Sequence, residues 1–172
     1  MKMKKLLVVL FLLLLLPAVV YASTYSGYHW RSANNLIVFD TTYSPKWVEA
    51  TQNAVDGWNQ SPNVEITLRR VSQCPKHYKV CIKEVNTEAP PYYAFAVIWP
   101  KGDIIHLAQV VLNDWAVDFS KDQAIFDRTM CHEIGHVLGL SPSADPDSCM
   151  GGSVDHPSAA DYALLETIYG GH

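Results

Sequence analysis

Short apolar segments separated by turn residues dominate the first two thirds of the chain. Segments that are rich in β-branched and aromatic residues, or that alternate apolar with polar residues, are typical of strands. We expect strands at residues 35–40, 65–71, 80–85 and 93–99, and two strand-like pieces within residues 104–113. Pro100-Lys101-Gly102 is predicted to end the fourth of these segments.

Two helices are predicted between and after these strands. Ser44 and Pro45 suit the N-cap and first turn of a helix over residues 45–59, whose buried face would carry Trp47, Ala50, Ala54 and Trp58. Ser120-Lys121-Asp122-Gln123 matches a capping box, which predicts a helix from about residue 121 to Gly139.

The remaining part of the chain predicts a loop and one more helix. Residues 140–157 are rich in Ser, Pro, Asp and Gly, as loops are. A last helix should begin at Ser158 or Ala159 and end at Gly170. Strands first and helices last favour an α+β fold.

Residues 1–22 have the three parts of a secretory signal peptide. Basic residues precede an apolar run from Leu6 to Leu16, and the segment ends in Val20-Tyr21-Ala22. A membrane span needs about 20 apolar residues, so the run alone is too short for an anchor. We therefore expect cleavage after Ala22, and a secreted or periplasmic protein formed by residues 23–172.

Composition excludes several classes of partner. Lys2, Lys4 and Lys5 leave with the signal peptide, so the formal net charge falls from −4 to −7. Such a charge, without a basic run, disfavours nucleic acid and anionic membranes as partners. The length suits one domain, and we expect a monomer without a stable membrane anchor. Export also favours disulfides, for which the four cysteines allow three pairings.

One motif carries candidate chemistry. His132-Glu133-Ile134-Gly135-His136 matches H-E-x-x-H and lies within the predicted helix 121–139. Histidines at i and i+4 lie on the same helix face, so both rings can reach one zinc ion. Glu133 lies beside them and can act as general base on a zinc-activated water without binding the metal. The competing interpretation is an amphipathic helix with two surface histidines.

The surroundings of this motif resemble the metzincin metallopeptidases, and within them the matrixin-like branch. Residues 131–140 read CHEIGHVLGL, and in that family the glycine three residues after the second histidine lets the chain turn. Asp147-Ser148-Cys149-Met150 looks like the family's Met-turn, and residues 162–170 are similar to its closing helix. The resemblance implies a single metzincin-like domain over residues 23–172. Its mixed twisted sheet would be combined with an active-site helix and a C-terminal helix.

The third zinc ligand departs from the family pattern. Pro142 occupies the position of the family's third histidine, and proline offers no side-chain ligand. We favour Asp145 as the substitute and keep Asp147 as the alternative. Asp155, His156 and Glu166 fit less well, because the first two follow the Met-turn and the last is distant. The alternative is an impaired site, since two ligands alone hold zinc weakly.

The cysteines and Met150 have expected structural roles near this site. In an exported chain we favour a Cys131–Cys149 disulfide that joins the ligand loop to the helix, with a zinc-binding thiolate as the alternative. Cys74 and Cys81 would then form a second disulfide. Met150 is expected to pack as a hydrophobic floor beneath the metal rather than to act in catalysis.

Two functions follow from this pattern. The first is a secreted zinc endopeptidase, with Zn²⁺ held by His132, His136 and Asp145 and with Glu133 as catalytic base. Its peptide substrate would lie extended along an edge strand, for which residues 93–99 are the candidate. The second is a catalytically weak binding protein that keeps the same fold.

Overall fold

The computed structural model describes residues 23–88, 92–117 and 122–171. The predicted signal peptide, residues 1–22, lies outside the described residues. Within the described ranges, no helix is long and apolar enough to cross a membrane.

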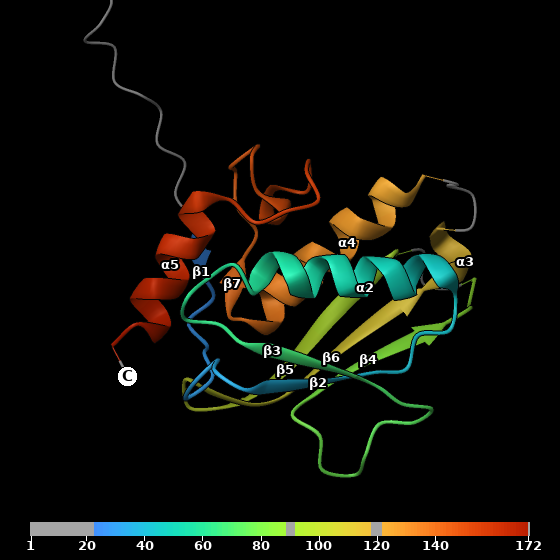
Figure 1. Cartoon of the computed structure of the whole chain (residues 1–172), viewed down its shortest axis with the longest axis horizontal. Coiled ribbons are helices and arrows are strands. Elements are labelled where there is room, and N and C mark those ends of the chain that lie inside the picture. The colour runs from blue at the N-terminus through green and yellow to red at the C-terminus, as the bar shows by residue number, and fades with distance from the viewer. Residues whose placement is uncertain (1–22, 89–91, 118–121, 172) are drawn as a thin grey trace, which may run out of the picture.

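The chain forms one mixed α+β domain around a five-stranded twisted sheet (Figure 1). The strand order is β3-β2-β4-β6-β5. The strands β3, β2, β4 and β6 are parallel to one another. At the edge beside β6, β5 pairs antiparallel with it. The strands span β2 (Leu36–Asp40), β3 (Ile66–Arg70), β4 (Val80–Val85), β5 (Ala94–Lys101) and β6 (Ile104–Asn113).

Four α-helices are found in the described ranges: α2 (Pro45–Trp58), α3 (Asp114–Val117), α4 (Gln123–Val137) and α5 (Ala159–Tyr169). Figure 1 shows α2 and α4 side by side on one face of the sheet. The apolar face predicted for α2 is buried, since Trp47, Ala50, Ala54 and Trp58 are at most 1% exposed. The connection between β3 and β4 lies on the other side of the sheet, and a Cys74–Cys81 disulfide ties it to β4.

Two expectations about the strands are wrong in detail. The segment 104–113 is one continuous strand rather than two pieces. In addition, β5 passes through Pro100 to Lys101, with a register shift between Trp99 and Pro100. Proline is tolerated here because an edge strand leaves backbone groups unpaired on its outer side.

The start of α4 also differs from the expectation. Asp122 is its N-cap, and its carboxylate accepts a hydrogen bond from the Ala124 N–H (3.1 Å). A capping box at Ser120 would make Gln123 the third helical residue, but Gln123 is the first. Ser120 itself lies outside the described residues. A capping box does form at α5, between Ser158 and Asp161.

A sharp turn follows α4, as expected from Gly139. The helix ends at Val137, and Gly139 has a φ of +93°, which favours glycine. The chain then forms β7 (Leu140–Ser141), which pairs antiparallel with β1 (Thr24–Tyr25). The predicted loop that follows contains a short 3₁₀ helix, η1 (Cys149–Gly151).

Buried aromatic side chains hold α4 in place. The Trp58 indole N–H, from α2, donates to the Cys131 carbonyl oxygen (2.9 Å). At the end of α4, the Trp30 indole donates to the Val137 carbonyl (2.8 Å) and the Tyr169 hydroxyl to that of Leu138 (2.8 Å). The last two bonds satisfy carbonyls that have no partner within the helix. The helix that carries the H-E-x-x-H motif is thus fixed along its length.

Candidate active site

His132 and His136 lie one turn apart on α4, with ring centroids separated by 4.5 Å. The Nδ1 atom of His132 lies 2.9 Å from the Cys149 carbonyl oxygen, and Nδ1 of His136 lies 2.9 Å from that of Leu140. Because a carbonyl oxygen only accepts, each Nδ1 carries the proton. In the neutral ring this leaves the lone pair on Nε2, the arrangement by which proteins orient metal-binding histidines.

The neutral form of His136 is favoured by its surroundings. Burial lowers its pKa, the Leu140 carbonyl acts in the opposite direction, and His132 lowers it slightly further. A metal binds neutral imidazole, so this environment favours the form that can act as a ligand.

Glu133 is a buried carboxylate beside the histidine pair. Its side chain is 7% exposed, and its Oε2 atom is fully enclosed without a hydrogen-bond partner in the described part of the chain. Burial raises its pKa to about 7, although a hydrogen bond from the Ala96 backbone opposes this effect. Ala96 belongs to the edge strand β5, so the carboxylate faces the place where an added strand would lie.

The Cys131–Cys149 disulfide predicted from the sequence is present. It links α4 to η1, and the Cys149 carbonyl oxygen is the acceptor for His132. The covalent link and the hydrogen bond therefore join the same two segments. Both cysteines are paired, which removes the alternative that either is a thiolate ligand.

Met150 packs directly under the helix turn between the two histidines. It is 1% exposed, and a Cβ atom added at Gly135 would overlap its Sδ atom and approach Trp58 Cζ2 at 2.9 Å. Only glycine leaves room for this contact. Met150 is thus a packing residue against the motif helix, and this contact requires Gly135; its expected place beneath a metal stays a prediction.

The third predicted ligand is placed differently from the histidines. Asp145 is 6% exposed, and its Oδ1 atom accepts a hydrogen bond from the Asp147 N–H (3.0 Å). Among the described residues, no three His, Cys, Asp or Glu side chains form a group that could hold a metal ion. The structure thus brings together His132 and His136 but not Asp145 with them. Asp145 as a ligand stays a prediction.

The other ligand candidates take part in other contacts or face solvent. Asp147 is exposed, and Asp155 and His156 are exposed and contact each other (3.0 Å). Glu166 is exposed on α5, and Pro142 is exposed in the loop after β7.

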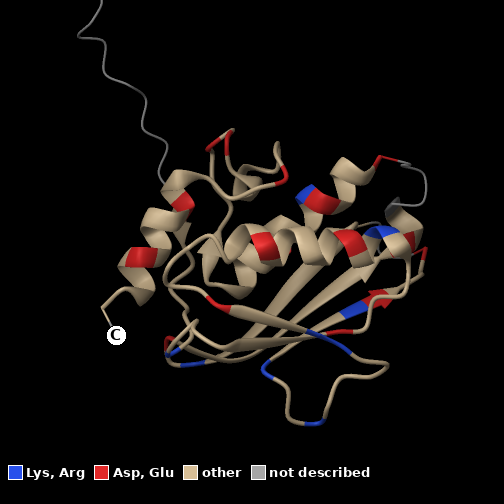
Figure 2. Cartoon of the chain, viewed as in Figure 1, with Lys and Arg blue, Asp and Glu red and all other residues tan. Residues whose placement is uncertain are grey.

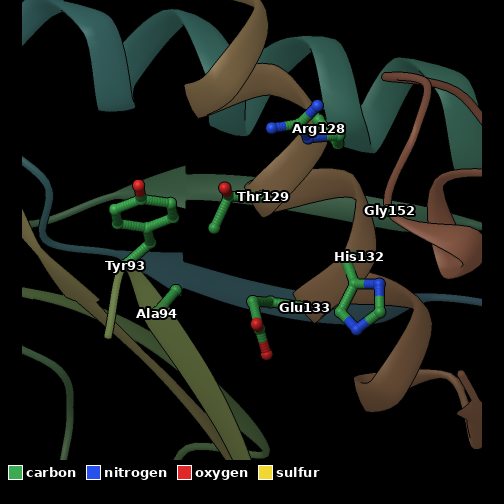
Figure 3. Close-up of a pocket in the computed structure, with 7 residues that line it drawn as sticks. All are labelled: Tyr93, Ala94, Arg128, Thr129, His132, Glu133 and Gly152. Atoms are coloured by element: carbon green, nitrogen blue, oxygen red, sulfur yellow. The ribbon is translucent and has the colours of Figure 1, made fainter. Parts of the chain in front are cut away.

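A pocket of about 270 Å³ opens between β5 and α4 (Figure 3). Figure 3 shows Tyr93 and Ala94 on the strand side and residues of α4 opposite them, with the Glu133 carboxylate and the His132 ring pointing the same way. The lining residues are Tyr93, Ala94, Arg128, Thr129, His132, Glu133 and Gly152. The pocket thus adjoins His132, Glu133 and the start of the edge strand.

The residues present fit zinc in part. Two imidazoles with oriented Nε2 atoms are suitable ligands, and the unpartnered Oε2 of Glu133 is suited to accept a proton rather than to complete the ligand set. Zinc at a catalytic site needs three protein ligands, and the described residues bring only the two histidines together.

Four contributors to this site could not be read from the motif alone. The backbone groups of Ala96, Leu140 and Cys149 carry no residue-specific signal, so no pattern could have identified them. Arg128 could have been found, because it lies four residues before His132 and hence on the same face of a helix.

Comparison with known proteins does not assign the chain to a family. No model of a known protein family matches it, and no curated protein matches it.

Proposed function

We propose that the chain is an exported zinc-dependent endopeptidase with a matrixin-like metzincin fold. One observation carries this proposal: two histidines whose Nδ1 atoms are held by backbone carbonyls lie beside a carboxylate with one buried, unpartnered oxygen, and His132 and this carboxylate line a pocket along an edge strand. Packing alone does not account for this combination, because burying a carboxylate oxygen without a partner destabilises the fold.

The chemistry divides among three side chains. His132 and His136 would hold the zinc ion, with Asp145 as the expected further ligand. Zinc bound there would polarise the scissile carbonyl and make an attacking water more acidic. Glu133 takes the proton that this water loses and delivers it to the leaving amine, so the proton balance closes. Its buried position keeps the carboxylate basic enough for this task.

The edge strand offers the backbone groups to which a peptide can add. The Asn113 N–H donates to the Tyr93 carbonyl oxygen (2.8 Å), which places Tyr93 in a hydrogen-bonded pair with β6. In an antiparallel ladder such pairs alternate, so the backbone groups of Ala94, Ala96 and Ile98 point to the free edge. An extended peptide paired there would lie beside Glu133.

A second candidate is a binding protein without peptidase activity. It is favoured by Pro142 at the third-ligand position and by the hydrogen bond that occupies Asp145. Such a protein would use the same pocket and edge strand without hydrolysis.

Zinc content and peptide cleavage separate these candidates. The wild-type chain should hold about one zinc ion and cleave casein or gelatin. His132→Ala and His136→Ala should lose zinc and activity together, whereas Glu133→Gln should keep zinc and lose activity. His77→Ala, at an exposed loop position, is the matched control and should change neither. Substoichiometric zinc without cleavage by the wild type would support the binding protein instead.

Export can be tested on the same protein. Mass spectrometry of the form recovered outside the cell should give a chain that begins at Ser23. A chain that still contains residues 1–22 and stays with the membrane fraction would contradict export as a cleaved protein.

A further inference from the structure

Arg128 lies in the candidate active-site pocket and has no partner among the described residues. It lines the pocket from α4, is half-buried, and makes no hydrogen bond or ion pair within the described part of the chain. Among the Lys and Arg residues of α2, α4 and α5, the other is Lys46. Its ammonium group lies 4.9 Å from the centre of the Phe126 ring. Arg128 is therefore free to bind a group that enters the pocket.

The local charge makes this guanidinium stand out. Figure 2 shows acidic residues along α2 and α5 and in the loops near α4, whereas most Lys and Arg residues lie on strands and loops at the other side of the sheet. Glu133 is the acidic residue among those that line the pocket. A positive charge at this place attracts an anion that the surrounding acidic surface otherwise repels.

The shape of the pocket sets what can reach Arg128. In Figure 3 Arg128 lies towards the top of the view and Glu133 towards the bottom. They are five residues apart on α4, which corresponds to about 7.5 Å along the helix axis. The Tyr93 ring and the Ala94 methyl group line the pocket on the side of β5, opposite α4 and its Thr129. A ligand that fits would be apolar along its stem and carry a negative charge at its tip.

We propose that Arg128 is a specificity-determining residue that selects peptides with an acidic side chain next to the cleaved bond, with glutamate preferred to aspartate. This inference rests on the proposed endopeptidase function. Guanidinium groups bind carboxylates through two parallel hydrogen bonds. Glutamate is preferred because its longer methylene stem spans the apolar walls. A free C-terminal carboxylate has the same chemistry and is distinguished by the test.

The test uses peptides that differ at one position. C-terminally amidated, fluorescence-quenched peptides carry Glu, Asp, Gln or Lys beside the cleaved bond, and kcat/KM is measured for each. The wild type should prefer Glu to Gln about tenfold, as expected for one partly exposed charge-assisted contact. This preference should fall at high salt, because exposed charges are screened.

Substitutions at Arg128 should change the preference in a defined way. Arg128→Gln should remove the preference for Glu, Arg128→Lys should keep part of it, and Arg128→Glu should turn it towards Lys. Arg69→Gln removes the same charge at an exposed position on β3 and is the matched control; its preference should equal that of the wild type. A Glu preference that survives Arg128→Gln, or that is absent from an active wild type, would overturn the inference. Preference for a Gln peptide with a free C-terminus over the amidated Glu peptide would assign Arg128 to C-terminal carboxylates instead and overturn the side-chain proposal.

A binding measurement separates failure of this inference from failure of the proposed function. In the Glu133→Gln background, fluorescence anisotropy reports the affinity of labelled peptides without hydrolysis. If the wild type cleaves no peptide, the endopeptidase proposal fails. The inference about Arg128 then stands on two results: the Glu peptide binds about tenfold more tightly than the Gln peptide, and Arg128→Gln removes this difference. Equal binding, or no binding of either peptide, refutes it.

Discussion

Replacement of Glu133 by glutamine should stabilise the metal-free protein at about pH 8 and have little effect near pH 5. Glu133 is a carboxylate whose pKa is raised by burial from 4.5 to about 7. Between these two values the folded state binds its proton more tightly than the unfolded state does. The free energy of unfolding therefore falls as the pH rises through this window, and the loss is complete above about pH 7.

The size of the effect follows from the two pKa values. One pKa unit corresponds to about 1.4 kcal/mol, so the ionised carboxylate costs the folded state about 3 kcal/mol above the window. Glutamine has nearly the same shape and carries no charge, so it removes this dependence on pH. The glutamine amide, however, leaves a buried N–H donor without a partner, which lowers the free energy of unfolding by about 1 kcal/mol. The net gain in the free energy of unfolding near pH 8 should therefore be about 2 kcal/mol.

Urea denaturation at the two pH values measures the effect. Both proteins are studied with intact disulfides and a chelator present, so that no metal binds to the histidines. Other titrating groups contribute equally to both proteins and cancel in the difference. If the two proteins differ by the same amount near pH 5 and near pH 8, Glu133 does not have the raised pKa, and the reasoning is refuted.

Three further substitutions test how the site is held, each by denaturation of the folded protein. Gly139→Ala should lower the free energy of unfolding by at least about 2 kcal/mol, because φ is +93° and a Cβ would overlap the Tyr28 carbonyl oxygen; a smaller loss would show that the turn is not strained by a side chain. Asp161→Ala removes a fully buried carboxylate that accepts three hydrogen bonds and should cost about 3 kcal/mol, whereas a loss below about 1 kcal/mol would contradict this role. Joint replacement of Cys131 and Cys149 by alanine opens a link across 18 residues and should cost about 3 kcal/mol while lowering zinc affinity; unchanged zinc affinity would show that the disulfide does not position His132.

The chain pattern predicted most of the elements of this fold. Residues such as Trp47 and Trp58 recur at helical spacing because one face of α2 is buried, and that spacing is visible in the sequence. The order of the strands was not predicted, because β2 lies between β3 and β4 through pairings over long separations. The two pieces expected in residues 104–113 form one strand because its alternate residues, such as Ala108 and Val110, fill the core.

The candidate site was predicted as far as its motif extends. The spacing of His132, Glu133 and His136 placed them together, and export with four cysteines suggested both disulfides. The orientation of the imidazoles depends on two backbone carbonyls, which any residue supplies, so it could not be predicted. Arg128 lies outside the motif, and only its spacing of four residues from His132 on one helix face indicates it.

Titration of zinc into the metal-free chain, followed by the rate of peptide cleavage, tests the central claim most directly. The account predicts that the rate rises in proportion to added zinc, reaches a plateau at about one ion per chain, and is absent in Glu133→Gln at every zinc concentration. A wild-type chain that shows no cleavage at any amount of zinc, or cleavage that Glu133→Gln retains, would contradict the account.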